Sequence, residues 1–406
     1  TVKVTVGEAV VSKCSCALHS LPLLAPPFVC PAIFSQVLEN TNETDIYGDV
    51  IGVIVTYIYR DEQFIEWKTM NKCTTMLVRA SYGNVDILVP TWASVSAAIS
   101  RSYLGAKFEP ENFARKTSKH IEDEIDAIWK SKCAKNDRLY NASKFRLAGC
   151  EMKQDNLVLH LGLTCYKDLC GTNLSENFSL LQAKGTKDFS NKQAYMSDVL
   201  GVGLLAITSD ACLVVTRRAQ WTGEYPGALD RPGGHPEPSH IFLPDGSLKP
   251  DYSHLKTEEA VLQEVWGSAK QEAVDELGIS EANIGEVSLM GVTLNKEAGG
   301  RPSLEFYAKL GVSSEHVTTT YKLGVQAEVE ESSSVHLLRP QTLAQLPRLL
   351  QSHSFIEGAA RSPDDKDEPE EDIHLQEARW LLQEATPALR AALLLAVNTR
   401  LLPLSL

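Results

Sequence analysis

The sequence predicts an α+β protein, and three observations support that class. The chain has 406 residues, of which 43% are hydrophobic and 22% are charged, an ordinary globular composition with length for two or three domains. Short segments rich in β-branched residues, separated by turn signals, indicate strands. Longer segments, such as 258–277, place apolar residues at helical spacing.

Three segments show the predicted strands most clearly. "NLVLHLGLT" (156–164) and "LEFYAKLGV" (304–312) are each expected to form one strand. "VLGVGLLAITSDACLVVTRRA" (199–219) predicts a hairpin with Ser-Asp at its turn. "GVGLLA" within it is not a dinucleotide-binding loop, because its third glycine position is Ala206 and no helix follows.

Composition and periodicity divide the chain into four parts. Residues 1–84 are β-rich and faintly resemble an OB-fold of replication protein A, so we expect a small all-β extension. Residues 85–190 form an N-terminal subdomain, with helical spacing in "IEDEIDAIWKSKC", and residues 191–340 form the core. Residues 341–406 predict C-terminal helices, interrupted by an acidic insert at 361–372 that we expect to be disordered.

Charge and composition limit the classes of binding partner and the cellular location that we expect. The formal net charge of −13 and the low basic content of 1–84 argue against a nucleic-acid binder. The apolar run "VIGVIVTYIY" is too short to span a bilayer. Nine scattered cysteines without zinc-ribbon spacing indicate reduced thiols. We therefore expect a cytoplasmic protein, with the nucleus as an alternative location; the oligomeric state stays open.

The segment "KQEAVDELGI" (270–279) gathers carboxylates on one predicted helix. Thr257 is expected to be its N-cap and Gly278 its stop. At about 100° per residue, four carboxylates fall within an arc of ~120°: Glu264, Glu272, Asp275 and Glu276. One interpretation is a solvated helix face. The other is a site for Mg²⁺ or Mn²⁺, since oxygen-only ligands suit these ions.

A second stretch, "RPGGHPEP" (231–238), favours the metal site. Together the two stretches resemble the two halves of the Nudix box, G-x5-E-x7-R-E-U-x-E-E-x-G-U, where U is aliphatic. The first half begins at Gly233 and Gly234 and includes Glu237; the second runs from Gln271 to Ile279. The insertion "SHIFLPDGSLKPDYSHLKTEEA" separates them. The resemblance implies a Nudix fold, a mixed β-sheet sandwiched between helices.

The box departs from the family pattern at three positions. Gln271 stands where the family has an arginine, Asp275 replaces a glutamate, and Glu264 is one residue too close for the x7 spacing. The motifs "KFRLAG", "LHLGLTCYKDLCGTN", "YPGALDRPGGHPEP" and "NKEAGGRPSLEFY" nevertheless resemble the uridine diphosphate glucose pyrophosphatase branch, from about 85 to 335. In that branch the glutamine and the split box are ordinary features.

The resemblance implies an activity and a set of roles. It implies Mg²⁺-dependent hydrolysis of UDP-glucose or UDP-galactose to UMP and hexose 1-phosphate. Glu272 and Glu276 are then the first metal ligands, with Asp275, Glu264 and the carbonyl of Gly234 as further ligands. Gln271 can orient a carboxylate oxygen by hydrogen bonding. One carboxylate is expected to act as general base, without the sequence indicating which.

Substrate contacts are expected from side chains near the glycine-rich turns. The arginine candidates for clamping a diphosphate are Arg217, Arg218, Arg231 and Arg301. Tyr166 is a candidate for stacking on the base, with packing in the core as its alternative. His235 is expected to be structural. GDP-mannose or ADP-ribose hydrolysis, and a catalytically silent Nudix-fold binding module, are the alternative functions.

Overall fold

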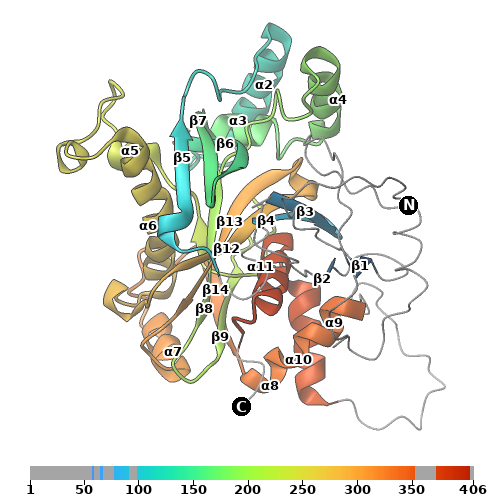
Figure 1. Ribbon diagram of the computed structural model, residues 1–406, viewed down its shortest axis with the longest axis vertical. Helices are drawn as coiled ribbons and strands as arrows, with labels where there is room; N and C mark the ends of the chain where they lie inside the picture. The colour runs from blue at the N-terminus through green and yellow to red at the C-terminus, as the bar shows by residue number, and fades with distance from the viewer. Residues whose placement is uncertain (1–56, 59–64, 67–76, 91–97, 353–371, 403–406) are drawn as a thin grey trace, which may run out of the picture.

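The computed structural model describes residues 57–58, 65–66, 77–90, 98–352 and 372–402 (Figure 1). Its centre is a nine-stranded mixed sheet. Along the main path the strands are β10 (Leu229–Asp230), β9 (Leu213–Arg218), β8 (Gly201–Ile207), β13 (Arg301–Lys309), β12 (Ser288–Asn295), β4 (Val85–Pro90) and β3 (Leu77–Tyr82). β11 (Gly233–Gly234) also pairs with β8, and β14 (Ser332–Leu338) pairs with β9.

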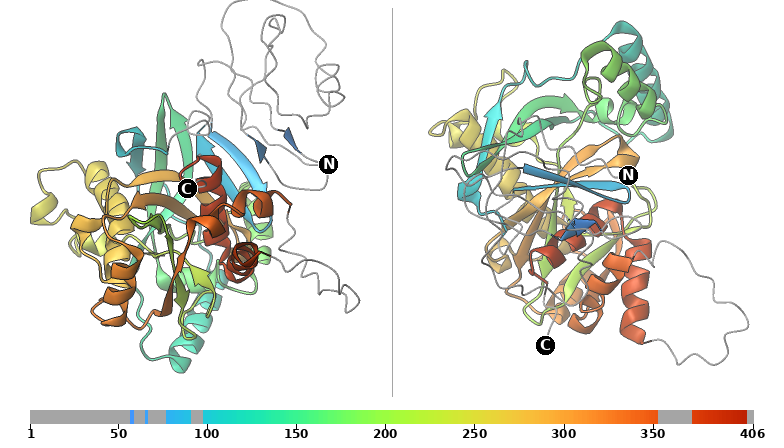
Figure 2. Two further views of the ribbon diagram at one scale, coloured as in Figure 1. Left: turned by 90° about the horizontal axis from the view of Figure 1, so that it is seen from below. Right: turned by 45° about the vertical axis from the view of Figure 1, so that its right-hand side comes forward.

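Helices cover both faces of this sheet, because alternate residues of each buried strand point to opposite sides. Leu204 of β8 belongs to the core beneath α6 (Thr257–Leu277), whereas Leu205 belongs to the core beneath the C-terminal helices. Figures 1 and 2 show α6 and the red C-terminal helices on opposite sides of the strands. The predicted α+β class, with a mixed sheet between helices, is confirmed.

The second sheet has three strands in the order β5-β7-β6, with β5 parallel and β6 antiparallel to β7. These strands and three helices form the N-terminal subdomain. Its elements are β5 (Leu104–Phe108), α2 (Lys119–Lys135), β6 (Ser143–Lys153), β7 (Asn156–Cys165), α3 (Tyr166–Gly171) and α4 (Phe178–Phe189). The strand predicted at 156–164 is confirmed as β7.

The predicted boundary at residue 84 is wrong. β3 and β4 form one antiparallel hairpin across it, and β4 pairs with β12 of the large sheet. The hairpin is therefore part of the core sheet. Of the rest of the predicted β-rich extension, the structure describes only β1 (Tyr57–Ile58) and β2 (Ile65–Glu66), which pair with each other. The OB-like interpretation and most of the acidic insert lie outside the described residues.

The other helical predictions are confirmed at the level of elements. The C-terminal helices are α8 (Pro340–Leu343), α9 (Leu346–Ser352), α10 (Ile373–Glu384) and α11 (Pro387–Asn398). Shorter helical elements are η1 (Arg101–Tyr103), α5 (Pro238–Ile241), η2 (Pro250–Tyr252), η3 (Glu281–Asn283), η4 (Lys296–Ala298) and α7 (Ser314–Lys322). No helix in the described part of the chain is both long enough and apolar enough to cross a membrane.

The helix expected at 258–277 is confirmed as α6, which ends at Gly278 in the left-handed conformation (φ 69°). Glycine adopts this conformation without the steric cost of a Cβ atom. The N-cap prediction is wrong: Lys256 precedes the helix, and Thr257 is its first residue.

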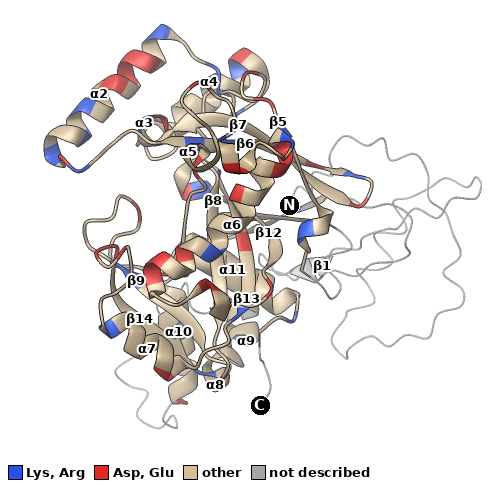
Figure 3. Cartoon of the chain, turned by 90° about the vertical axis from the view of Figure 1, so that its left-hand side faces the viewer, with Lys and Arg blue, Asp and Glu red and all other residues tan. Residues whose placement is uncertain are grey.

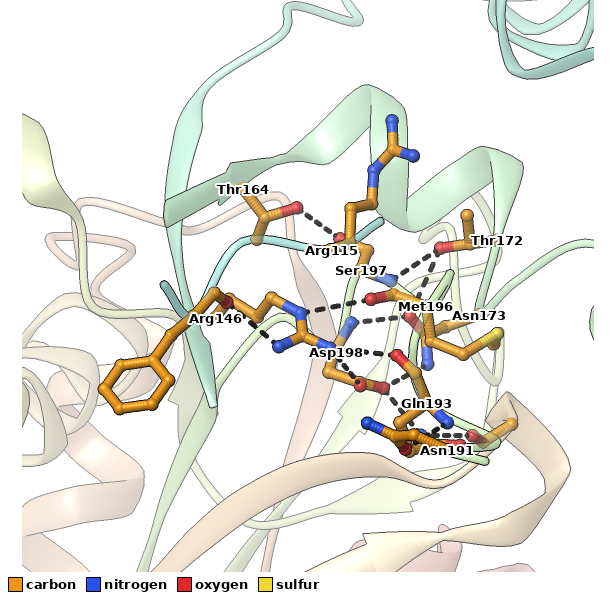
Figure 4. Close-up of polar contacts among 12 residues, drawn as sticks. Arg115, Arg146, Thr164, Thr172, Asn173, Asn191, Gln193, Met196, Ser197 and Asp198 are labelled. Carbon is orange, nitrogen blue, oxygen red and sulfur yellow. Dashed lines mark hydrogen bonds and ion pairs between the residues drawn. The ribbon is translucent and has the colours of Figure 1, made fainter. Parts of the chain in front are cut away.

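A buried polar network joins the subdomain to the core (Figure 4). The Arg146 guanidinium of β6 donates to the carbonyls of Phe113, Gln193 and Met196, and it pairs with Asp198 at 3.2 Å. Asn173 donates to both Asp198 and the carbonyl of Ala298. Burial raises the pKa of Asp198 to about 6, against the opposing effect of Arg146. This network fixes β6 next to the large sheet.

We predict that Arg146→Met destabilises the protein by about 3–5 kcal/mol, because it leaves the buried Asp198 carboxylate without its cationic partner and removes one donor from each of three carbonyls. Arg138→Met is the control, since Arg138 pairs with Glu330 at the surface with 74% of its side chain exposed; it should change stability by less than about 1 kcal/mol. Chemical denaturation measures both. Equal effects of the two substitutions would contradict a special role for the network.

Candidate functional site

The candidate site is centred on the Gly233–Gly234 turn, where β11 lies against α6. The backbone N–H of Gly233 donates to Glu276 Oε1 at 2.7 Å, and the Thr216 hydroxyl donates to Glu276 Oε2 at 3.3 Å. Glu276 is 7% exposed. These two donors hold its carboxylate toward the turn.

Gly234 brings the backbone close to the second carboxylate. A Cβ atom at this position would lie 2.4 Å from Glu272 Oε1, a distance that real Cβ atoms do not occupy. Any side chain at position 234 therefore requires Glu272 to move. The glycine allows a backbone segment and a carboxylate to face each other at short range.

Mutual repulsion and burial alter the acidity of the cluster. Burial, together with Glu328 and Glu276, raises the pKa of Glu272 well above its usual value. Burial is also the main cause that raises the pKa of Glu276 to about 8, and the Gly233 N–H opposes it. Burial and Glu331 raise the pKa of Glu328 to about 7. Such shifts are typical of functional sites.

The residues at this turn fit a divalent cation of the Mg²⁺ type. The donors are carboxylate oxygens, the set that hard cations prefer, and Glu328 Oε2 is buried without a hydrogen-bond partner. A cation would relieve the repulsion that raises these pKa values. Across the described residues, no three His, Cys, Asp or Glu side chains already surround a common point, so the carboxylates must turn toward the ion.

The structure separates the other predicted acidic ligands from this turn. Gln271 donates to both oxygens of Asp275, at 2.9 and 3.0 Å, so its amide orients Asp275. Glu264 accepts from the Glu237 backbone N–H at 2.9 Å and lies 2.8 Å from His240 Nδ1. Through these contacts Glu264 joins α6 to the segment that follows the glycine turn.

The two arginines of β9 and the arginine just before the glycine turn lie in different surroundings. Arg218 lies on the α6 face of the sheet, where it acts on Glu276. Arg217 points to the opposite face and pairs with Glu384 of α10 at 3.1 Å. Arg231 is 7% exposed and binds Asp230, Ser303 and Glu305. Arg217 and Arg231 are thus occupied in the fold, contrary to their predicted role at the diphosphate.

Arg301 contacts His235, the residue that follows the turn, and Tyr166 lies against Gly223. Arg301 Nη1 donates to His235 Nε2 at 3.0 Å, and Nη2 pairs with Glu224 at 2.9 Å. Burial, followed by Arg301, lowers the pKa of His235 well below its usual value, so His235 is a neutral acceptor. Tyr166 is partly buried, with its ring edge-to-face with Trp129.

Sequence reasoning missed two residues of this site. Glu328 follows α7, and its backbone N–H donates to the carbonyl of Asp275 at 3.0 Å, which places it beside the end of α6. Lys144 of β6 pairs with Glu237 and is 8% exposed. Neither residue lies in a motif that signals a site, because both reach the turn through tertiary packing. The quoted motif "KFRLAG" contained Lys144 without indicating its role.

No family model matches the sequence, whereas individual known proteins do. The uridine diphosphate glucose pyrophosphatase NUDT22 of Bos taurus is 37% identical over 227 residues, which are 55% of this chain and 77% of the relative. Its Homo sapiens counterpart is 35% identical over 241 residues, 58% of this chain and 77% of the relative. Nudix hydrolase 9 of Arabidopsis thaliana is 32% identical over 213 residues, covering 50% and 67%.

Among solved structures, a Nudix hydrolase from M. smegmatis, RenU, matches 50% of this chain and 88% of its own, with 12% identity and a TM-score of 0.23.

Gly234→Ala tests the close approach at the turn. We predict a loss of metal affinity of about tenfold or more, because the new Cβ displaces Glu272 from its position. Manganese binding, followed by electron paramagnetic resonance, measures it. Gly267→Ala on α6 is the control, since its Cβ meets nothing within 4 Å; it should leave binding unchanged and stabilise the helix by about 0.5–1 kcal/mol. Unchanged binding in Gly234→Ala would contradict the geometry.

Glu276→Gln should stabilise the metal-free protein above neutral pH. The folded-state pKa of Glu276 is raised to about 8, so the stability that its proton provides is complete below pH ~4.5 and lost as pH rises through about 8. The neutral amide avoids that loss, and we expect roughly 1–3 kcal/mol at pH 8, vanishing toward pH 4.5. Denaturation across pH with chelator measures it. A less stable variant at pH 8 would contradict the assignment.

Proposed function

The chain belongs to the Nudix hydrolases, and on that premise we propose that it hydrolyses the diphosphate of a UDP-sugar, giving UMP and a hexose 1-phosphate. The observation that carries this proposal is the meeting of Glu272 and Glu276 with the Gly233–Gly234 turn. The NUDT22 relatives are named for UDP-glucose, and this supports a uridine nucleotide as substrate. UDP-glucose and UDP-galactose are the proposed substrates.

Glu272 and Glu276 are the proposed holders of Mg²⁺, with Mn²⁺ as the alternative ion, and the carbonyl of Gly234 is a further proposed ligand. The bound ion would polarise the diphosphate and lower the pKa of a coordinated water. The Gly233 N–H and the Thr216 hydroxyl keep the Glu276 carboxylate at the turn. Asp275, held by Gln271, lies one residue before Glu276 and is proposed as an outer support of the same cluster.

We assign the general base to Glu328. Its pKa of about 7 matches the range in which a base both accepts and releases protons near neutral pH. Oε2 has no partner in the fold, so it can accept the proton of the attacking water. The residue comes from outside the box helix, which leaves Glu272 and Glu276 for the metal.

Arg218 and Arg301 are the arginines proposed to bind the diphosphate. Both reach the 219–227 loop, where Arg218 Nε donates to the carbonyl of Glu224 and Arg301 pairs with its carboxylate. Guanidinium groups bind phosphate oxygens through paired donors. Tyr166, whose hydroxyl lies against Gly223 of this loop, stays a candidate contact for the base.

The decisive experiment is UMP release from UDP-glucose in the presence of Mg²⁺. We expect release only with metal, and a loss of about a hundredfold or more in Glu272→Gln, equivalent to ~3 kcal/mol of transition-state stabilisation. Glu258→Gln is the matched control, because Glu258 lies in the exposed first turn of the same helix; it should retain full activity.

Competing substrates distinguish the remaining functions. GDP-mannose or ADP-ribose cleaved faster than UDP-glucose would replace the uridine assignment while keeping the hydrolase. A folded wild-type protein that cleaves none of the three would indicate a Nudix-fold binding module. Full activity in Glu272→Gln would remove the carboxylate cluster as the metal site.

A further inference from the structure

The carboxylates around the turn concentrate negative charge, and α6 does not supply the positive charge that would balance it. Besides burial, Glu328 and Glu276 raise the pKa of Glu272, and Glu328 also raises the pKa of Glu276; Gln271 is neutral. A diphosphate is itself an anion and must enter this field. Cations beside the metal are therefore needed to bind it.

Arg218 and Arg301 supply positive charge beside the 219–227 loop. Both are tied to Glu224 in the 219–227 loop. Glu237, which follows the turn and acts on Glu328, borders the N-terminal subdomain through Lys144 of β6. The α5 helix there packs against both α6 and β6, and Figure 3 shows these three elements together.

Lys144 is the cation at this border. It is 8% exposed, pairs with Glu237, and lowers the pKa of both Glu328 and His235. Its ammonium therefore lies between the segment after α7 and the glycine turn. An ammonium group has three donors, and the hydrogen bond to Glu237 uses one. The others remain available for phosphate oxygens.

The fold holds Lys144 in this position through its own strand. Lys144 and Arg146 are two residues apart on β6 and point to the same face, whereas Phe145 between them is fully buried in the hydrophobic core. Arg146 is anchored to Asp198. The same acidic side chains act on the nearby Tyr140, because Glu237, Glu328 and Glu331 raise the pKa of its hydroxyl. The start of β6 thus borders the acidic cluster.

We propose that Lys144 is a catalytic residue of this enzyme: its ammonium binds the substrate diphosphate from the N-terminal subdomain, together with Arg218 and Arg301. This inference rests on the proposed function, whose substrate is a diphosphate. It makes the subdomain part of the site, because the large sheet and α6 alone lack this cation. The expected ligand class is any diphosphate that reaches the bound metal.

The test uses imidodiphosphate, a pyrophosphate analogue with a nitrogen bridge, and the full chain loaded with Mn²⁺. Calorimetry should show binding weakened about tenfold or more in Lys144→Met, since a charge-assisted hydrogen bond is lost. Lys144→Arg, which keeps the charge, should stay within about threefold. Lys153→Met is the control, because Lys153 lies exposed at the far end of β6; it should bind as wild type does.

Two further measurements separate substrate binding from a structural role. Mn²⁺ affinity without the anion should not weaken in Lys144→Met, because removing a nearby cation reduces repulsion of the metal. The double variant Lys144→Met with Glu237→Gln removes both partners of the ion pair, so that no carboxylate is left there without its cation. Its imidodiphosphate affinity should remain as weak as that of Lys144→Met alone.

Four outcomes would overturn the proposal: wild-type protein that does not bind imidodiphosphate, Lys144→Met affinity within threefold of wild type, loss of Mn²⁺ binding in Lys144→Met, or recovery in the double variant. The last two would make Lys144 a support for Glu237. Wild-type protein that binds imidodiphosphate but releases no UMP refutes the proposed function separately, because this binding test requires no hydrolysis.

Discussion

The contact between the Gly233–Gly234 turn and α6 is the constraint on which the rest of the site depends. It places a backbone without Cβ atoms against carboxylates that the fold has partly removed from water. Desolvation and repulsion make this arrangement unfavourable when the carboxylates are ionised. The Gly233 N–H is one of the few groups that oppose this cost for Glu276. A divalent cation would relieve this repulsion, so the unfavourable arrangement of the carboxylates and the proposed metal chemistry share one physical cause.

The N-terminal subdomain influences the contact between the glycine turn and α6 through one strand, β6. Along β6, Arg146 belongs to the buried network with Asp198, and Lys144 reaches the acidic cluster. Along β6, residues that anchor the fold or carry positive charge therefore alternate with buried apolar residues. A shift of β6 would change the position of the Lys144 ammonium relative to Glu237. The polar network therefore contributes to the electrostatics of the site, beyond its contribution to stability.

The sequence contained enough to predict the local elements and part of the site. The capping glycine and the apolar spacing predicted α6, and the resemblance to the Nudix box singled out Glu272 and Glu276, because these signals are local. Strand alternation also separates Arg217 from Arg218, since neighbours on a strand face opposite sides. Applied to this pair, it would have favoured Arg218 as the residue on the α6 face. Glu328 and Lys144 could not be found this way, because tertiary packing alone brings them to the turn.

The path of the insertion between the two halves of the Nudix box is visible in the structure, and it also explains the position of Glu264. Between the two halves, the chain leaves the turn through α5, and Ile241 packs fully buried in the core beneath the sheet. Phe242 stacks on Phe108 of β5, with ring centroids 5.4 Å apart. Glu264 accepts the Glu237 N–H and contacts His240, and so it ties the start of the insertion directly to α6. By these contacts Glu264 keeps the two halves in register. The carboxylates proposed as the first metal ligands, Glu272 and Glu276, lie in the last two turns of α6, where the glycine turn reaches them.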